Sequence, residues 1–251
     1  MNDIQIVVTK SALPTTADFR SGLLMLVDKP KDWTSFDVVN KLRYKVRHRH
    51  GTKKFKVGHA GTLDPMATGL LLIAIGKYTK LLDQLQGLGK SYSATIMLGG
   101  TTPSYDAEEA EDAQYPTAHI TRQLVDGCLE DYRGDIMQMP PMYSALKVDG
   151  VRLYKKARKG QTVEIKKRPV NVSQLDVTRF DLPLLDVACT VSKGTYIRSL
   201  AHDIGQSLQS GGYLTQLRRT RVADYSVEDA LSVDQAVEWI ENVELSGVSL
   251  L

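Results

Sequence analysis

The chain has 251 residues, of which 42% are hydrophobic and 24% are charged, and these values are typical of a globular protein with one large or two small domains. Its longest dense apolar run, Leu70–Ile75, is too short to cross a bilayer. The two cysteines lie far apart and lack neighbouring ligands, which argues against a disulfide framework or a structural zinc site. We therefore expect a cytoplasmic protein with no membrane contact and no bound metal.

The first predicted elements are a strand and a helix. Residues 1–21 are expected to form a flexible lead-in, and residues 22–28 (GLLMLVD) a buried strand. Either Thr34 or Ser35 is suited to cap the helix that follows. The helical periodicity assigns its apolar face to Phe36, Val39, Leu42 and Val46.

A strongly basic segment follows on and after this helix. Between Lys41 and Lys56 the chain carries eight lysines or arginines, two histidines and no acidic residue, although the net charge of the whole chain is only +3. Such a block repels itself unless an anion neutralises it. We interpret this basic segment as a contact surface for a phosphate backbone, with Lys53 and Lys54 as candidate contacts; the alternative is a solvated helix face and loop.

A polar loop between two strands is the first candidate catalytic element. Strands are expected near residues 55–58 and 69–75, and the intervening stretch, within GHAGTLDPMATG at 58–69, is rich in Gly, Pro and polar residues. Asp64 stands immediately before Pro65, which restricts the local backbone. The loop is expected to place Asp64 at the rim of a cleft, although an Asp-Pro turn is also common as a purely structural feature.

The rest of the chain mixes strands with helices. We expect a strand, a helix, a basic segment, further strands, a helix, a strand and a last helix, at residues 91–98, 120–132, 139–160, 163–191, 195–208, 213–225 and 233–241. Cys189 is expected as a buried residue in one of the strands. Because strands occur both in adjacent runs and between helices, the order predicts an α+β fold with a mixed, mostly antiparallel sheet flanked by helices.

The stretch SKGTYIR at 192–198 is the second candidate site. Thr195 is a plausible N-cap, and Arg198 would lie one turn into the helix. A planar Arg fork is suited to hold a carboxylate in one pose and to keep it ionised. The alternative is a capped helix whose basic side chains are solvated.

Several motifs in one order carry a family resemblance. Through the motifs given in the next sentence, the chain resembles the TruB family of tRNA pseudouridine-55 synthases over about residues 22–225. The motifs are Lys29-Pro30, TSFDVV at 34–39, GHAGTLDPMATG at 58–69, KSY at 90–92, residues 98–106, PPMYSALK at 140–147, Tyr154, Ala157-Arg158, SKGTYIR at 192–198 and LRR at 217–219.

The resemblance implies a domain organisation. It implies a pseudouridine synthase fold over residues 22–225, with an RNA-gripping insertion at about 136–165. Residues 226–251 would form a C-terminal helix and tail, because too few residues follow Arg221 for the RNA-binding PUA domain that longer members carry. The implied partner is the T-arm stem-loop of tRNA. Independently of the resemblance, we expect a monomer.

The resemblance also implies roles for individual residues. Asp64 becomes the catalytic aspartate, and Arg198 becomes its partner. His59 would wedge into the RNA where the target base leaves its stack, and Tyr92 would stack on the flipped uracil. The same pocket would include Lys29 and Tyr196.

The implied reaction needs no cofactor. It breaks the N1–C1′ bond, rotates the uracil and joins C5 to C1′, so atoms are conserved and no electrons are exchanged. Asp64 would either attack C1′ as a nucleophile or remove the 2′ proton, and the sequence leaves both routes open. The alternative function is a tRNA-binding folding chaperone with secondary catalysis; a basic RNA-binding domain of unknown target is the third.

Two positions depart from the family pattern. Asp32 stands where the family usually has Gly, and we expect the turn to form because Asp tolerates left-handed backbone. Pro103 stands where the family often has an acidic residue, although Asp106 still matches, so the local loop geometry is open.

Overall fold

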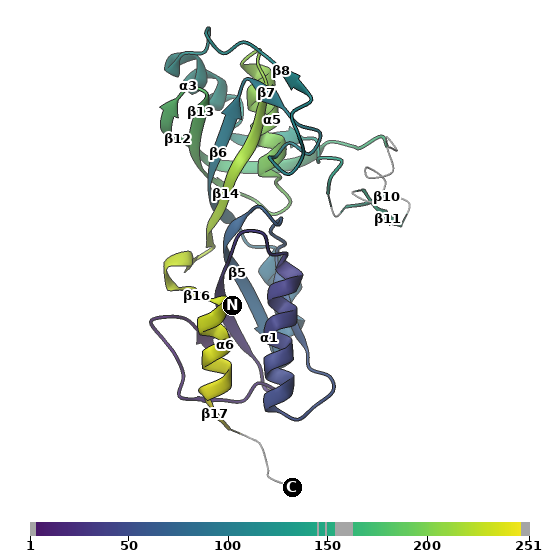
Figure 1. Cartoon of the computed structure of the whole chain (residues 1–251), viewed down its shortest axis with the longest axis vertical. Coiled ribbons are helices and arrows are strands. Elements are labelled where there is room, and N and C mark those ends of the chain that lie inside the picture. Colours follow the sequence, from purple (N-terminus) through teal and green to yellow (C-terminus); the bar gives the residue numbers. More distant parts are fainter. Residues whose placement is uncertain (1–3, 145, 149, 154–162, 247–251) are drawn as a thin grey trace. The chain divides into compact units, whose positions relative to one another are not determined.

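The computed structural model describes residues 4–144, 146–148, 150–153 and 163–246 (Figure 1). The chain divides into two compact units, one formed by residues 1–90 with 218–251 and the other by residues 91–217. The chain combines helices with a mixed, mostly antiparallel sheet, which confirms the predicted α+β class. In the described part of the chain, no helix is long and apolar enough to cross a membrane.

The first unit is built on the β3–β5 pair. Strands β3 and β5 are antiparallel, with Leu23 opposite Ile75 at one end and Lys29 opposite Gly69 at the other. The elements of this unit are β1 (Val7–Val8), β2 (Thr16–Ala17), β3 (Leu23–Lys29), α1 (Ser35–Arg49), β4 (Val57–Ala60), β5 (Thr68–Ile75), η1 (Gly76–Leu81), α2 (Leu82–Gln86), the part of β14 (Gly212–Val222) from residue 218, β15 (Tyr225–Ser226), η2 (Val227–Asp229), β16 (Leu231–Ser232), α6 (Val233–Asn242) and β17 (Glu244–Leu245).

Helix α1 begins as predicted, and Val39, Leu42 and Val46 of the predicted apolar face are buried. Thr34 is its N-cap and forms a capping box with Asp37. The buried stripe consists of Ser35, Val38, Val39, Leu42 and Val46. The assignment of Phe36 to the buried face was wrong, because its ring is 59% exposed and lies about 100° around the helix from the centre of the stripe. The guanidinium of Arg43 covers that ring instead, 5.4 Å from its centroid.

The second unit contains the strand order β14-β6-β13-β12-β9. Cys189 is buried in β13, as predicted. The elements are β6 (Lys90–Leu98, with residue 90 in the first unit), β7 (Gly100–Thr101), β8 (Ala113–Gln114), α3 (Arg122–Glu130), β9 (Gly134–Gln138), β10 (Lys147–Val148), β11 (Val151–Arg152), β12 (Arg168–Asp181), β13 (Leu184–Val191), α5 (Ile197–Ser207) and the part of β14 up to residue 217.

Helix α5 begins at Ile197, two residues after the start of the expected range 195–208. Its N-cap is Tyr196, without a side-chain cap, so the prediction of Thr195 as N-cap was wrong. The reason is that the Thr195 hydroxyl donates to the Ser192 carbonyl oxygen at 3.0 Å and closes the preceding turn.

Part of the expected RNA-gripping insertion is described and part is not. The β10–β11 pair lies within it. The motif residues Tyr154, Ala157 and Arg158 lie outside the described residues.

Candidate active site

Asp64 lies on the loop that joins β4 to β5, as the sequence predicted. Strand β4 ends at Ala60 and β5 begins at Thr68, and the two strands pair antiparallel. Asp64 is half-buried between the buried side chain of Leu63 and Pro65. The backbone N–H of Ala67 donates to the Asp64 carbonyl oxygen at 3.1 Å, which closes a tight turn.

The start of helix α1 holds this loop from one side. The Leu63 N–H donates to the Ser35 hydroxyl oxygen at 2.8 Å, and that hydroxyl donates back to the Leu63 carbonyl oxygen at 3.1 Å. Ser35 is 2% exposed, so both bonds are shielded from water. The residue before Asp64 is thereby tied to a helix rather than to solvent.

The Lys29 ammonium holds the loop from the other side. This side chain is fully buried, and its Nζ donates to the carbonyl oxygens of Pro30 at 2.9 Å, Trp33 at 2.5 Å and Pro65 at 3.3 Å. Asp32 adopts φ +65° and its N–H donates to the Pro65 carbonyl oxygen at 2.8 Å. The expectation that Asp32 supports the left-handed turn is confirmed, and the turn also binds the Asp64-Pro65 step.

Two buried cations lie beneath Gly61, and sequence reasoning assigned them no role. Arg219 is fully buried; its Nε donates to the Leu70 carbonyl oxygen at 2.6 Å and its Nη2 to the Gly61 carbonyl oxygen at 3.1 Å. Lys90 donates to the carbonyl oxygens of Gln86 and Leu88. Gly61 has φ +87°, and a Cβ there would lie 3.0 Å from the Lys90 Cε, so the loop needs glycine at this point. Both residues belong to motifs of the sequence, Lys90 to KSY and Arg219 to LRR. A basic residue within a strand that also carries apolar residues could have indicated that these two cations are buried.

Burial beside Arg219 alters two titrating groups. Burial, and then the positive charge of Arg219, lowers the pKa of Lys90 to about 8. The same two causes in the same order lower the pKa of His59 on β4. His59 is therefore favoured in its neutral form at neutral pH.

In the second unit, Arg198 is buried against Asp106. Its Nη1 lies 3.3 Å from Asp106 Oδ2 and donates to the Ser104 carbonyl oxygen at 3.0 Å, while its Nη2 donates to the Tyr143 carbonyl oxygen at 2.8 Å. Arg198 is 6% exposed and Asp106 1%. The guanidinium plane is thus fixed from two edges.

The loop that carries Asp106 is tightly closed. The Ser104 hydroxyl donates to Asp106 Oδ1 at 2.6 Å, and the Glu108 N–H donates to the same oxygen at 3.1 Å. The Thr102 hydroxyl donates to the Asp106 carbonyl oxygen at 2.7 Å. Tyr105 takes a left-handed φ of +63°. Pro103 is therefore accommodated in a compact turn that leaves Asp106 facing Arg198.

Tyr196 is also held by a residue that sequence reasoning did not single out. Gln138 on β9 accepts from the Tyr196 N–H at 2.8 Å and donates to the Tyr196 carbonyl oxygen at 3.0 Å. Gln138 is 2% exposed. Tyr92 lies on β6 and is 8% exposed. No sequence motif pointed to Gln138, because its effect depends on the approach of β9 to the start of α5.

The predicted site residues fall into both units. Lys29, His59 and Asp64 belong to the first unit, and Tyr92, Tyr196 and Arg198 belong to the second. The pairing of Arg198 with Asp64 stays a prediction. In the first unit, Lys53 and Lys54 follow α1 and are exposed.

The chain matches known proteins along most of its length. A family model described as TruB family pseudouridylate synthase (N terminal domain) matches residues 47–197, and one described as tRNA pseudouridylate synthase B C-terminal domain matches residues 198–245. The chain is 50% identical over 231 residues to tRNA pseudouridine synthase B of Phocaeicola vulgatus, covering 92% of this chain and 98% of that protein. It is 49% identical over 220 residues to the protein of the same name from Flavobacterium johnsoniae, covering 87% and 96%.

Solved structures are similar in fold. One chain from a Cbf5-Nop10-Gar1 complex has a TM-score of 0.66 and 27% identity, and the match covers 88% of this chain. This chain spans about half of that one, since the match covers 54% of it.

Proposed function

The chain belongs to the TruB family of pseudouridylate synthases and is a tRNA pseudouridine synthase, and we propose that its target is the uridine at position 55 in the T-arm, with Asp64 as the catalytic carboxylate. The observation that carries the assignment of Asp64 is the way its loop is held. Ser35 binds the residue before Asp64, and Lys29 binds the residue after it. A carboxylate fixed at both neighbours loses little entropy when it engages a substrate.

The chemistry assigns one demanding task to Asp64. The N1–C1′ bond breaks, the uracil rotates, C5 bonds to C1′, the C5 proton leaves and N1 gains a proton. Asp64 acts either as a nucleophile at C1′ or as the base that removes the 2′ proton. Both routes need an ionised carboxylate, and neither needs an electron donor or acceptor.

Arg198 is the proposed partner of Asp64 during this reaction. Its contacts with Asp106, Ser104 and Tyr143 support that role, because they orient a charged fork before any substrate arrives. Asp106 would then act as a positioning residue that sets the direction of the guanidinium.

The target base must leave the RNA stack before it can react. Base flipping in nucleic acids costs a few kcal/mol, and stacking on an aromatic ring returns about 1–3 kcal/mol per base. We assign the stacking to Tyr92 and the wedge in the vacated stack to His59, whose lowered pKa favours a neutral ring. Lys29 and Tyr196 would complete the pocket as structural supports, since Lys29 binds loop carbonyl groups and Gln138 binds the Tyr196 backbone.

The basic segment would contact T-arm phosphates, with Lys53 and Lys54 among the contacts. The protein would act as a monomer in the cytoplasm. The family match favours this enzyme over the chaperone alternative.

Nucleoside analysis tests the proposal. A tRNA transcript incubated with the purified chain should gain one pseudouridine at position 55 of the T-arm. A transcript with cytidine at that position is the matched control and should gain none. Pseudouridine at another position would contradict the proposed target, and its complete absence would contradict the proposed function.

A further inference from the structure

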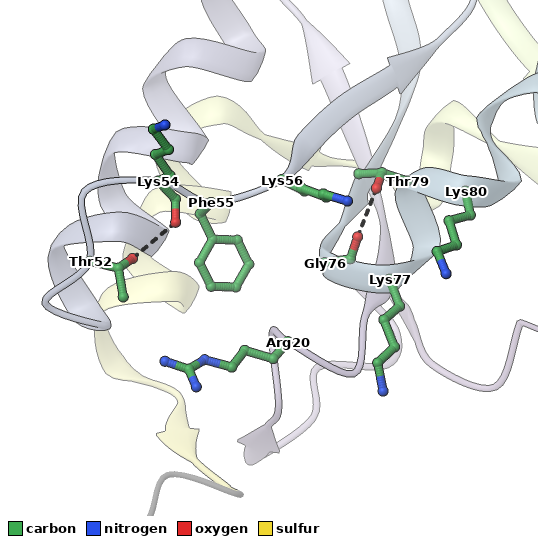
Figure 2. Close-up of a pocket in the computed structure, with 9 residues that line it drawn as sticks. All are labelled: Arg20, Thr52, Lys54, Phe55, Lys56, Gly76, Lys77, Thr79 and Lys80. Atoms are coloured by element: carbon green, nitrogen blue, oxygen red, sulfur yellow. Dashed lines mark hydrogen bonds between the residues drawn. The ribbon is translucent and has the colours of Figure 1, made fainter. Parts of the chain in front are cut away.

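A hollow of about 340 Å³ lies in the first unit, at the end of the β4–β5 hairpin opposite to the Asp64 loop (Figure 2). Lys56 precedes β4 and Gly76 follows β5, whereas the loop with Asp64 joins the other ends of the two strands. From Thr68 to Gly76, along β5 and one residue beyond it, the chain extends about 26 Å at roughly 3.3 Å per residue. The hollow is therefore separate from the catalytic loop.

Five cationic side chains and one aromatic ring line this hollow; they are Arg20, Lys54, Lys56, Lys77, Lys80 and Phe55. Within the described residues, no carboxylate lines it and none of the five cations forms an ion pair. The Asp18 carboxylate near Arg20 is already occupied by the Ser21 hydroxyl at 2.6 Å and the Arg20 N–H at 2.9 Å. No direct ion pair therefore neutralises these five side chains within the described part of the first unit.

Backbone hydrogen bonds hold the three segments of the hollow together. The Gly76 N–H donates to the Lys56 carbonyl oxygen at 2.9 Å, and the Lys77 N–H donates to the Arg20 carbonyl oxygen at 3.3 Å. Gly76 has φ +62°, and a Cβ there would lie 2.0 Å from the Phe19 carbonyl oxygen. The segments can approach this closely only because residue 76 is glycine. Like charges are thus brought together by main-chain structure rather than by chance side-chain poses.

Phe55 supplies an apolar wall among these charges. Its ring is half-buried and lies against the His50 ring, with centroids 5.2 Å apart. Figure 2 shows the ring beside the segment of Thr52 and Lys54, with Arg20 below it and Lys56 and Lys77 on the side of Gly76. An aromatic face next to cations matches a nucleotide, which offers a phosphate and a flat base.

We propose that this hollow binds the phosphate backbone of the tRNA at a distance from the target uridine, with one base stacked on Phe55. This inference rests on the proposed function. Only Lys54, Phe55 and Lys56 belong to the basic segment, and the fold adds Arg20, Lys77 and Lys80 to them. These added phosphate contacts, which continue from Lys54, would anchor the RNA without touching the reacting base. It would therefore contribute to affinity and to its salt dependence rather than to the chemical step.

Charge-neutral variants test the phosphate contacts. Lys77 and Lys80 are exposed, so the double variant Lys77→Gln/Lys80→Gln is expected to fold normally. It should bind whole tRNA about tenfold more weakly and lower the slope of log affinity against log salt by about 1.4–1.8. The single-turnover rate at saturating enzyme should stay unchanged. The matched control, Lys10→Gln/Arg221→Gln, removes the same charge from exposed positions of the same unit outside the hollow.

A second variant tests the aromatic contact. Phe55→Leu keeps an apolar side chain against the core but removes the ring. It should weaken tRNA binding by about fivefold or more without changing the salt slope, because stacking is not ionic. Binding of both variants with the affinity and salt slope of the control would overturn the proposal. A lack of pseudouridine formation by the unmodified chain would instead contradict the proposed function, and the binding comparison would still stand.

Discussion

The guanidinium of Arg198 and the carboxylate of Asp106 form an ion pair with 3.3 Å between Nη1 and Oδ2, and both side chains are almost completely buried. Burial of a charged pair is costly unless further hydrogen bonds satisfy both groups. Here the Ser104 and Tyr143 carbonyl oxygens accept from the guanidinium, and the Ser104 hydroxyl donates to the carboxylate. A buried network in which the charged groups have hydrogen-bond partners holds both side chains in one orientation.

Arg198→Lys should therefore impair catalysis although the charge is kept. A lysine ammonium cannot reproduce contacts made from two edges of a planar fork. We expect the single-turnover rate of pseudouridine formation to fall by about tenfold or more. A rate near that of the unmodified chain would remove Arg198 from the proposed mechanism.

Asp106→Asn should lower both the stability and the rate. Asparagine keeps the shape but leaves the buried Arg198 charge without its counter-ion, and urea unfolding should show a loss of stability of about 3–5 kcal/mol. If Asp106 positions Arg198, the double variant with Arg198→Lys should lose less activity than the product of the two single losses. Fully multiplicative losses would contradict that positioning role.

Asp64→Asn should reduce pseudouridine formation to the background while the Kd for tRNA changes by less than about twofold. Asparagine keeps the shape of the side chain but is neither a nucleophile nor a base at neutral pH. Single-turnover assays and filter binding measure the two quantities. Substantial turnover by the purified variant would show that another group carries the reaction.

Tyr92→Phe and Tyr92→Leu separate two roles of this ring. If stacking is its only role, Phe should retain activity, and Leu should lose about 5- to 150-fold, which corresponds to 1–3 kcal/mol. If the phenol also takes the C5 proton, the Phe variant should bind tRNA normally but turn over slowly. Normal turnover by the Leu variant would exclude Tyr92 from both roles.

Lys90 should make the stability of the chain depend on pH. Its pKa is about 8 in the folded protein and near 10.5 when unfolded, so between these values the unfolded state binds more protons. The free energy of unfolding should therefore rise as the pH increases from about 8 to 10.5, by up to about 3 kcal/mol. Lys90→Met should remove this part of the rise in urea unfolding measured at pH 8 and pH 10. An unchanged pH profile would show that the Lys90 ammonium is not desolvated.

The order of elements was predictable because it depends on local patterns. The alternation of apolar residues around Cys189 predicted a strand there, which the structure shows as β13, and Thr34 was one of two residues predicted to cap α1. The loop between β4 and β5 followed from its Gly and Pro content, and with it the position of Asp64. Phe36 was misassigned because several helical stripes share residues, and packing against the sheet selects one of them.

The sequence by itself determined which residues are candidates for the chemistry, since the order and spacing of the family motifs single out Asp64, Tyr92 and Arg198. Only the tertiary structure decided what holds them: Lys29 across 36 positions to Pro65, Gln138 at the start of α5, and Arg219 beneath Gly61. It also brought Arg20, Lys77 and Lys80 to the end of the basic segment. The physical reason is the distance along the sequence over which each interaction acts. Propensity, capping and turn chemistry act within a few residues. Hydrogen bonds and charge clusters between distant segments form only when the chain folds.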